Sequence, residues 1–280
     1  MDIRYSTGKE PFKTLNTEQL REEFLIQNIF IENDVTSTYS HVDRIVTLGA
    51  MPTNKEIALD KNINAMSDFG VNFFLERREL GIINIAEKGL VKVDGKEFIL
   101  NHYDALYLPM GTKEVLLSSL DSKNPAKFYM NSTPAHIAYE LKLITLEDAK
   151  HLHLGSSAEC NERTINQYIH PAVLDTCQLS MGLTHLEDGS VWNTMPAHTH
   201  ERRMEVYFYF NIPEDQAVFH FMGEPTETRH MVIHNEEAVI NPSWSIHSGS
   251  GTTNYTFIWS MAGENRVFTD MDKINTEDLR

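Results

Sequence analysis

The sequence has little cysteine, no long apolar run and no excess of basic residues. Its 280 residues include two cysteines, Cys160 and Cys177, and neither has a CxxC partner. Two thiols do not make a disulfide scaffold, so we expect both to be reduced and buried in a cytoplasmic protein. No stretch approaches the roughly 20 apolar residues of a membrane span. The first residues, MDIRYS, show no apolar core of a secretory signal.

Acidic residues outnumber basic ones by 40 to 24, which gives a formal net charge of −16. A surface of that sign repels nucleic acids and anionic lipids, so we expect neither class among the partners. An anionic substrate would need a local cation set against this field. Apolar residues make up 41% of the chain and charged residues 23%, as is typical of a globular protein.

Short apolar segments separated by turns dominate the sequence from about residue 29 onward. Residues 82–85, 90–93 and 98–100 are predicted strands, and Asp94-Gly95 between the last two is a typical hairpin turn. Strands at this spacing favour a β-sandwich or barrel over a βαβ fold. A short helix is predicted over residues 16–26, where Asn16 and Gln19 have the spacing of a capping box.

The chain contains two similar β-rich halves. The triplet ERR at 76–78 recurs 125 residues later at 201–203, and residues 104–109 recur 133 residues later at 237–242. The difference between these offsets predicts a longer hairpin in the second copy, around residues 213–216. We therefore predict a mainly β protein with two tandem barrels and short helices. The expected domains are residues 1–140, with the leading helix, and residues 141–280.

Several of the 13 histidines lie between His185 and His247. His198 and His200 are two residues apart, which on a strand places both side chains on one face. Glu205 can begin the neighbouring strand and turn back toward them, and His247 closes the set from a distant strand. Three imidazoles and one carboxylate suit Zn²⁺, and also Fe²⁺, Mn²⁺, Ni²⁺ or Co²⁺. We predict one metal site at these four residues, His198, His200, Glu205 and His247.

The spacing of these residues matches the cupin superfamily. His198-x-His200-x4-Glu205 has the spacing of the first cupin motif, and a proline five residues before His247 has that of the second. The corresponding positions of the first half are apolar: Phe73, Leu75 and Leu80. We therefore expect the first barrel to bind no metal and to serve in packing.

Longer motifs resemble one cupin family in particular. They are FLERRELG at 74–81, NTMP at 193–196, HERRMEVYFYF at 200–210 and PSWSIHSG at 242–249. Together with matches at both ends of the chain, they resemble the 5-keto-4-deoxyuronate isomerase family. The resemblance implies a cytoplasmic, homohexameric bicupin with one Zn²⁺ per chain on the four predicted ligands. It also implies an aldose–ketose isomerisation in pectin and related uronate catabolism, from 5-dehydro-4-deoxy-D-glucuronate to 3-deoxy-D-glycero-2,5-hexodiulosonate.

Polar residues near the predicted metal are candidates for substrate binding and proton transfer. If Glu205 points into the barrel, strand parity places Arg203 and Tyr207 on the same face. Tyr207 is a candidate general acid or base, and Arg203 is a candidate clamp for the substrate carboxylate. Arg163 and Gln178 are further candidates near the barrel entrance. Structural alternatives stay open, with Tyr207 as barrel packing and Arg203 as an ion-pair partner.

Two other functions stay open from the residues alone. The same donor set binds Fe²⁺ in cupin dioxygenases, and oxygen consumption would distinguish such an enzyme. A non-enzymatic sugar-binding or storage bicupin typically lacks metal ligands, whereas this chain keeps all four. The favoured partner is therefore a small anionic keto-uronate.

Overall fold

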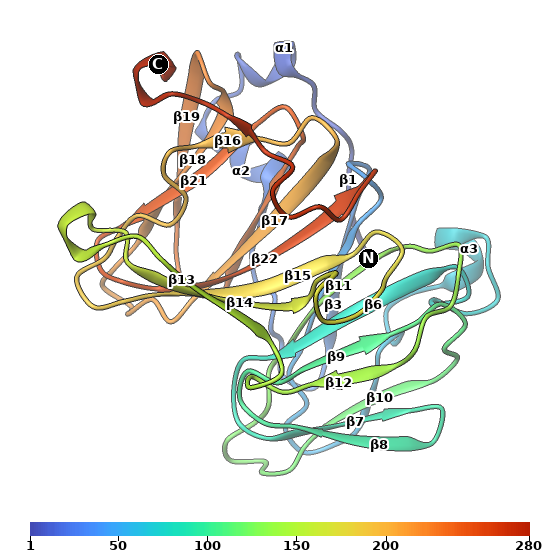
Figure 1. The fold of residues 1–280 in the computed structure, drawn as a ribbon. Helices are drawn as coiled ribbons and strands as arrows, with labels where there is room; N and C mark the ends of the chain where they lie inside the picture. The colour runs from blue at the N-terminus through green and yellow to red at the C-terminus, as the bar shows by residue number, and fades with distance from the viewer. The chain divides into compact units, whose positions relative to one another are not determined.

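Short apolar runs, each ended by a turn, form the strands of this protein, as the computed structural model of residues 1–280 shows (Figure 1). Asp94 and Gly95, for example, both have positive φ and join β7 (Gly89–Val93) to β8 (Lys96–Leu100). That backbone suits Asp-Gly in a two-residue hairpin turn. The predicted mainly β class is confirmed.

The chain forms two compact units. Unit 1 consists of Met1–Ile3, Asn28–Ala149 and Tyr168–Ser180, and unit 2 of Arg4–Gln27, Lys150–Gln167 and Met181–Arg280. These units differ from the predicted continuous domains 1–140 and 141–280 in three segments. Residues 4–27, with the leading helix, belong to unit 2, and residues 141–149 and 168–180 belong to unit 1.

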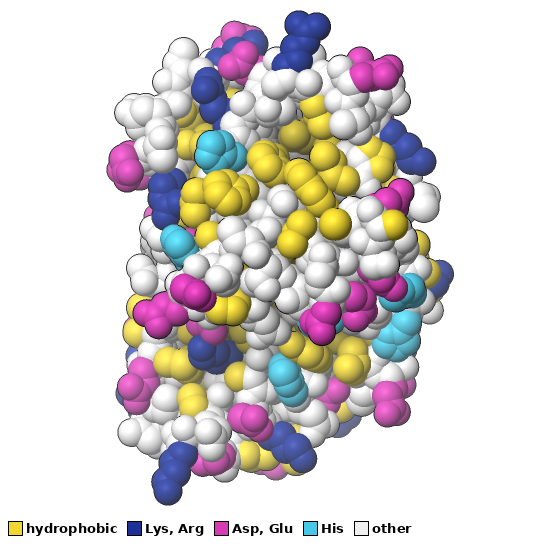
Figure 2. All heavy atoms as spheres, turned by 90° about the vertical axis from the view of Figure 1, so that its left-hand side faces the viewer, with side chains coloured by type: hydrophobic (Ala, Val, Ile, Leu, Met, Phe, Trp, Pro, Cys, Tyr) yellow, Lys and Arg dark blue, Asp and Glu magenta, His cyan; other side chains and the backbone are white.

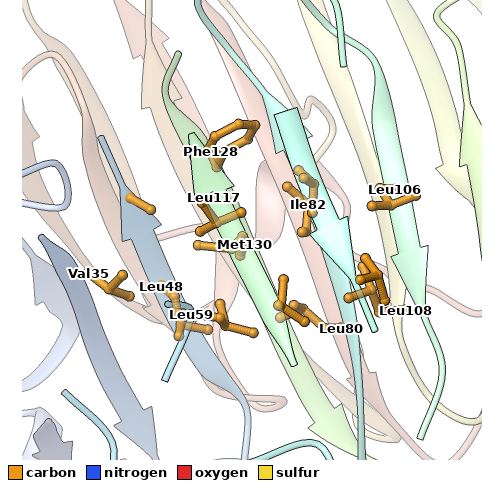
Figure 3. Packing of buried hydrophobic residues seen from close by; sticks show 14 of the residues in the cluster. Val35, Leu48, Leu59, Leu80, Ile82, Leu106, Leu108, Leu117, Phe128 and Met130 are labelled. Carbon is orange, nitrogen blue, oxygen red and sulfur yellow. The ribbon is translucent and has the colours of Figure 1, made fainter. Parts of the chain in front are cut away.

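Unit 1 is built on two sheets, with strand orders β1-β3-β4-β11-β6-β9-β12 and β5-β10-β7-β8. Besides β7 and β8, the strands of these sheets are β1 (Asp2–Arg4), β3 (Val35–Ser40), β4 (Val46–Ala50), β5 (Ile57–Ala58), β6 (Arg78–Asn84), β9 (Ala105–Leu108), β10 (Val115–Ser119), β11 (Phe128–Pro134) and β12 (Lys142–Ile144). One hydrophobic cluster joins both sheets, with Leu48, Ile82 and Met130 from the larger and Val91 and Leu117 from the smaller. Figure 3 shows neighbouring strands contributing side chains to this core. A short helix, α3 (Ala65–Phe69), completes the unit.

Most of a second seven-stranded sheet lies in unit 2, in the order β13-β14-β15-β22-β17-β20-β2, beside sheets β19-β18-β21 and β16-β23. The bounds are β2 (Leu25–Ile26), β13 (Lys150–Leu154), β14 (Arg163–Ile169), β15 (Ser180–Leu186), β16 (His198–Thr199), β17 (Arg203–Phe210), β18 (Val218–Glu224), β19 (Glu227–Ile233), β20 (Glu237–Asn241), β21 (Ile246–Gly251), β22 (Thr256–Gly263) and β23 (Asp272–Lys273). The helical segments are α1 (Lys9–Phe12), α2 (Thr17–Phe24), η1 (Ser157–Glu159) and η2 (Thr276–Asp278).

The predicted leading helix is shorter than expected, because residues 25–26 form β2. Its predicted capping box is confirmed: Gln19 N–H donates to Asn16 Oδ1, and Asn16 N–H donates to Gln19 Oε1, each at 3.0 Å. Leu20 and Phe24 lie on its buried face and join the hydrophobic core of unit 2. This core contains side chains from both larger sheets of the unit and fills the space between them, as in a jelly roll.

The order of the strands reproduces the internal repeat. The run β4-β11-β6-β9 of unit 1 corresponds to β15-β22-β17-β20, and β8-β7-β10 corresponds to β19-β18-β21. The hairpin arms β18 and β19 have seven residues each, against five in β7 and β8. The extra length of the second copy therefore lies partly in these arms and not only around residues 213–216.

The prediction of buried thiols was wrong, because Cys160 is exposed and Cys177 is half-buried. None of the helices combines the length and apolar character that crossing a membrane requires. On the face drawn in Figure 2, hydrophobic side chains gather in the upper half, and acidic and basic side chains are scattered around them.

Candidate active site

Four side chains from separate elements of unit 2 meet in one cluster. His198 lies on β16, His200 follows that strand, Glu205 lies on β17 and His247 lies on β21. Figure 1 shows these three strands in the upper part of the ribbon. All four side chains are buried, and one donor atom from each lies within 4.8 Å of the others. We call these four residues the donor cluster; the structure brings together every residue predicted to ligate the metal.

The three imidazoles of the donor cluster point their Nε2 atoms at one another. The distances are 2.9 Å from His198 to His200, and 3.1 Å from His247 to each of the other two. Glu205 Oε2 lies 2.9 Å from His247 Nε2 and 3.4 Å from His200 Nε2. The four donor atoms therefore surround a single point.

Charge and hydrogen bonding make this arrangement suitable for a cation. Burial lowers the pKa of His198 to about 2 and lowers that of His200, so both imidazoles are neutral. Burial alone would raise the pKa of Glu205, but His247 and His200 outweigh it and keep the carboxylate ionised. The Nδ1 atom of His247 faces the backbone oxygen of Ser245 at 3.4 Å, which favours a lone pair on its Nε2 directed inward. Three imidazole nitrogens and a carboxylate oxygen are a donor set that fits a divalent ion.

A cavity of about 260 Å³ opens beside the donor cluster. Its polar lining includes Arg163, Thr184, Asn193, Thr194 and Lys273, besides His198, His200, Glu205 and Tyr207. Its apolar lining includes Phe257, Trp259 and Met261 from β22, and Phe268 and Met271 from the C-terminal segment. Such a mixture of apolar walls and a few polar groups is typical of small-molecule sites.

Tyr207 lines the cavity and packs against the donor cluster. Its ring centroid is 5.3 Å from that of His247, and its hydroxyl is 3.0 Å from Thr194 Oγ1. Burial raises the pKa of Tyr207 well above its ordinary value, so the phenol stays protonated at neutral pH. The residue therefore both fills the barrel and presents a hydroxyl at the cavity.

The predicted role of Arg203 as a carboxylate clamp conflicts with its position. The side chain is 1% exposed and does not line the cavity. Its guanidinium donates to the backbone oxygens of Val267 (2.7 Å), Phe268 (3.3 Å) and Asp270 (3.1 Å). Its Nε–H also donates to His200 Nδ1 at 3.0 Å. Arg203 thus ties the C-terminal segment to the donor cluster, and this contact leaves it no free donor fork for a substrate.

The other two predicted binding residues differ from each other in position. Arg163 lines the cavity, where burial lowers its pKa and its Nη1 donates to Asn161 O at 2.7 Å. Gln178 lies in unit 1, where its backbone N–H donates to Glu79 at 2.7 Å, and it is not among the lining residues. Lys273, which the sequence did not suggest, lines the cavity because β23 pairs with β16 and places it opposite His198.

The chain matches the KduI/IolB family over residues 31–279. It belongs to that family. Relatives include the 4-deoxy-L-threo-5-hexosulose-uronate ketol-isomerases of Enterobacter sp. (strain 638), 55% identical, and of Yersinia pestis (strain Pestoides F), 57% identical. Each alignment spans 280 residues and 100% of both chains.

Solved structures place this KduI/IolB chain among cupin-type folds. An IolB-like protein from Salmonella typhimurium LT2 has a TM-score of 0.67 at 16% identity, over 82% of this chain and 87% of that one. Oxalate decarboxylase from Lactobacillus farciminis, in a formate complex, has a TM-score of 0.55 at 11% identity, over 83% and 79%. At such low identity these likenesses concern the fold alone, and they confirm the predicted cupin-type architecture.

Proposed function

We propose that this chain is a metal-dependent ketol-isomerase acting on an anionic deoxy-keto-uronate. The observation that carries the proposal is a buried donor cluster that opens on a cavity in a chain 55–57% identical to named ketol-isomerases. The substrate class follows from the names of those relatives. The proposed reaction converts 5-dehydro-4-deoxy-D-glucuronate to 3-deoxy-D-glycero-2,5-hexodiulosonate.

An aldose–ketose isomerisation moves one hydrogen from C2 to C1 and changes no overall oxidation state. The C2–H bond breaks, a C1–H bond forms, and the proton of the C2 hydroxyl ends on the C1 oxygen. A divalent ion held by His198, His200, Glu205 and His247 would supply Lewis-acid stabilisation of the negative charge that develops on the substrate oxygens. The chain's own side chains must then bind the substrate, carry protons and exclude water.

Tyr207 is the proposed proton carrier for a substrate oxygen. Its hydroxyl is at the cavity wall beside the donor cluster, and Thr194 Oγ1 at 3.0 Å restrains its orientation. A positioned hydroxyl of this kind contributes general acid–base catalysis when it lies within hydrogen-bond reach of the reacting group.

Arg163 and Lys273 are the proposed partners of the substrate carboxylate. Both line the cavity, and both bring positive charge into a chain with a net charge of −16. The planar guanidinium of Arg163 matches a carboxylate with two parallel N–H donors. The apolar walls from β22 exclude water, which strengthens these polar contacts.

The proposal extends to the finer properties that the sequence resemblance implies. The resident ion is Zn²⁺, one per chain, which the set of three imidazoles and one carboxylate suits. The protein is a homohexamer of the cytoplasm and acts on uronates released from pectin. Support for these properties is the donor set and the motifs shared with the isomerase family.

The test is incubation of the metal-loaded protein with 5-dehydro-4-deoxy-D-glucuronate, which is the same compound as 4-deoxy-L-threo-5-hexosulose-uronate. The product, 3-deoxy-D-glycero-2,5-hexodiulosonate, is detected by NMR. Conversion that disappears after chelation and returns with Zn²⁺ supports the proposal. An oxygen electrode in the same reaction distinguishes the alternative iron dioxygenase. Oxygen consumption, or no conversion by metal-replete protein, would overturn the assignment.

A further inference from the structure

Behind the cavity lies a line of buried hydrogen bonds that the proposed chemistry does not use. Tyr209 on β17 and His220 on β18 are both 0% exposed. The Tyr209 hydroxyl lies 2.7 Å from His220 Nδ1 and receives an N–H from Asn193 at 3.4 Å. On its other side, His220 Nε2 lies 2.8 Å from Oδ1 of Asn241, which is 1% exposed. A buried polar line of this length needs every member to have a partner.

The direction of each hydrogen bond follows from Asn241, the last residue of this line. Asn241 Nδ2 donates to Val239 O at 3.4 Å, so Oδ1 is the atom that faces His220. An amide oxygen only accepts, and therefore His220 Nε2 carries the ring proton and Nδ1 accepts from the Tyr209 hydroxyl. Burial lowers the pKa of His220 to about 3, which keeps the ring neutral. The Tyr209 oxygen is then left free to accept from Asn193.

Asn193 connects this line to the cavity. It lines the cavity and is clamped to Gly249 on β21: Gly249 N–H donates to Asn193 Oδ1 at 2.7 Å, and Asn193 N–H donates to Gly249 O at 3.1 Å. A Cβ on Gly249 would lie 3.0 Å from both Asn193 Nδ2 and the Tyr209 hydroxyl. The backbone of Asn193 continues directly into Thr194, which contacts the Tyr207 hydroxyl.

We propose that Tyr209 and His220 are positioning residues for the isomerisation. They fix Asn193, and through it Thr194, so that the Tyr207 hydroxyl keeps its orientation in the cavity. The inference rests on the proposed function for its catalytic readout. It assigns a role to two buried side chains that touch neither the donor cluster's inward atoms nor the substrate cavity.

The structure offers a matched pair of variants to test this role. Tyr209→Phe removes one hydroxyl and so takes away the hydrogen-bond partner of His220 Nδ1 and of Asn193 Nδ2. Tyr255→Phe removes the same atom from a neighbouring ring, 5.6 Å away by centroid, whose buried hydroxyl has no hydrogen-bond partner. The two variants differ in hydrogen bonding and little in volume, so their comparison separates positioning from packing.

Three experiments are done on each variant: steady-state kinetics that give kcat and KM for the uronate, analysis of metal per chain, and hydrogen exchange at the amides of residues 193–195. In Tyr209→Phe we expect kcat to fall about tenfold, less than the ~100-fold that a 1 Å misplacement can cost. KM and metal content should stay unchanged, and exchange at 193–195 should accelerate. Tyr255→Phe should leave all three at wild-type values.

Equal kcat and equal exchange in the two variants would overturn the inference. If wild-type protein shows no isomerase activity, the proposed function fails and the exchange data alone decide the positioning role. A second pair, His220→Gln against His220→Leu, repeats the test at the next residue. The Gln amide can still accept from Tyr209, so it should restore part of the kcat that the Leu variant loses.

Discussion

His247, on β21, is the donor-cluster residue that lies farthest along the sequence from the other three. Its Nε2 lies within 3.1 Å of Glu205, His198 and His200, so its loss opens one side of the cluster. We expect His247→Ala to lower both metal content and turnover. The fall in kcat/KM should exceed the roughly 10–100-fold that loss of an outer-shell partner of a metal ligand costs.

Metal analysis and kinetics on the same preparation check this expectation. His230→Ala is the control, because His230 is exposed on β19 and belongs to no group of candidate ligands. A metal-replete, fully active His247→Ala protein would contradict the assignment of the donor cluster as the metal site.

Arg203 and Arg163 should respond differently to the same conservative change. Lysine keeps the charge at position 203 but replaces a planar fork with a single ammonium, so backbone oxygens at 267–270 lose donors. A hydrogen bond to a charged group contributes about 1.5–3 kcal/mol to the free energy of unfolding. Arg203→Lys should therefore lower Tm, with KM for the uronate little changed.

Arg163→Lys is the matched variant, and it should raise KM while Tm stays near the wild-type value. Thermal melts beside steady-state kinetics separate the two effects. A rise in KM without loss of Tm in Arg203→Lys would restore the carboxylate clamp that its buried position argues against.

At the scale of elements, the segment from β22 to β23 is held by charge. Arg202 donates to both carboxylate oxygens of Asp270 at 2.8 Å and to Asp272 at 2.9 Å. The hydrogen bonds from Arg202 hold the pKa of Asp270 at about 2, below its ordinary value of 3.8. A carboxylate with a lowered pKa stabilises the fold above its unfolded pKa and loses that contribution as pH falls toward 2.

We therefore expect the segment around residues 264–273 to loosen in wild-type protein only between about pH 4 and 2, and in Arg202→Gln already at neutral pH. Hydrogen exchange of this segment measures the change. Since Phe268 and Met271 line the cavity, KM should rise in the same variant. Equal protection of the segment in both proteins at neutral pH would show that the ion pairs do not hold it.

The sequence predicts contacts between residues that lie close together in the chain, and it misses contacts between residues that lie far apart. His198, His200 and Glu205 lie within eight residues, so their spacing alone keeps them close, and on β17 strand parity places Arg203 and Glu205 on one face. Arg203 obeys the same parity, yet its long side chain turns toward backbone oxygens of a segment more than sixty residues away. No local pattern encodes that pairing, and the same holds for Lys273, which reaches the cavity through the β16–β23 bridge.

At the scale of the whole molecule, the two units differ in the residues at the positions of the donor cluster. In unit 1 the hydrophobic core includes Leu75 and Leu80, which correspond to His200 and Glu205 of unit 2. We expect metal titration to saturate at about one ion per chain, as for a single four-ligand site. Two tightly bound ions per chain, measured after removal of weakly bound metal, would contradict the packing role of unit 1.

The net charge of −16 repels an anionic uronate. Against it act Arg163 and Lys273 at the cavity, two cations close to the bound substrate. Salt screens both effects, and the Debye length falls from about 30 Å at 0.01 M to about 10 Å at 0.1 M. In Arg163→Gln/Lys273→Gln both side-chain cations are gone and the net charge of −16 becomes −18, so KM should be higher than in wild type and should decrease as salt is added. In wild-type protein the local attraction is screened as well, so KM should change less or increase.

Steady-state kinetics over that salt range compares the two proteins. Parallel salt dependences would mean that these cations do not contact the substrate carboxylate.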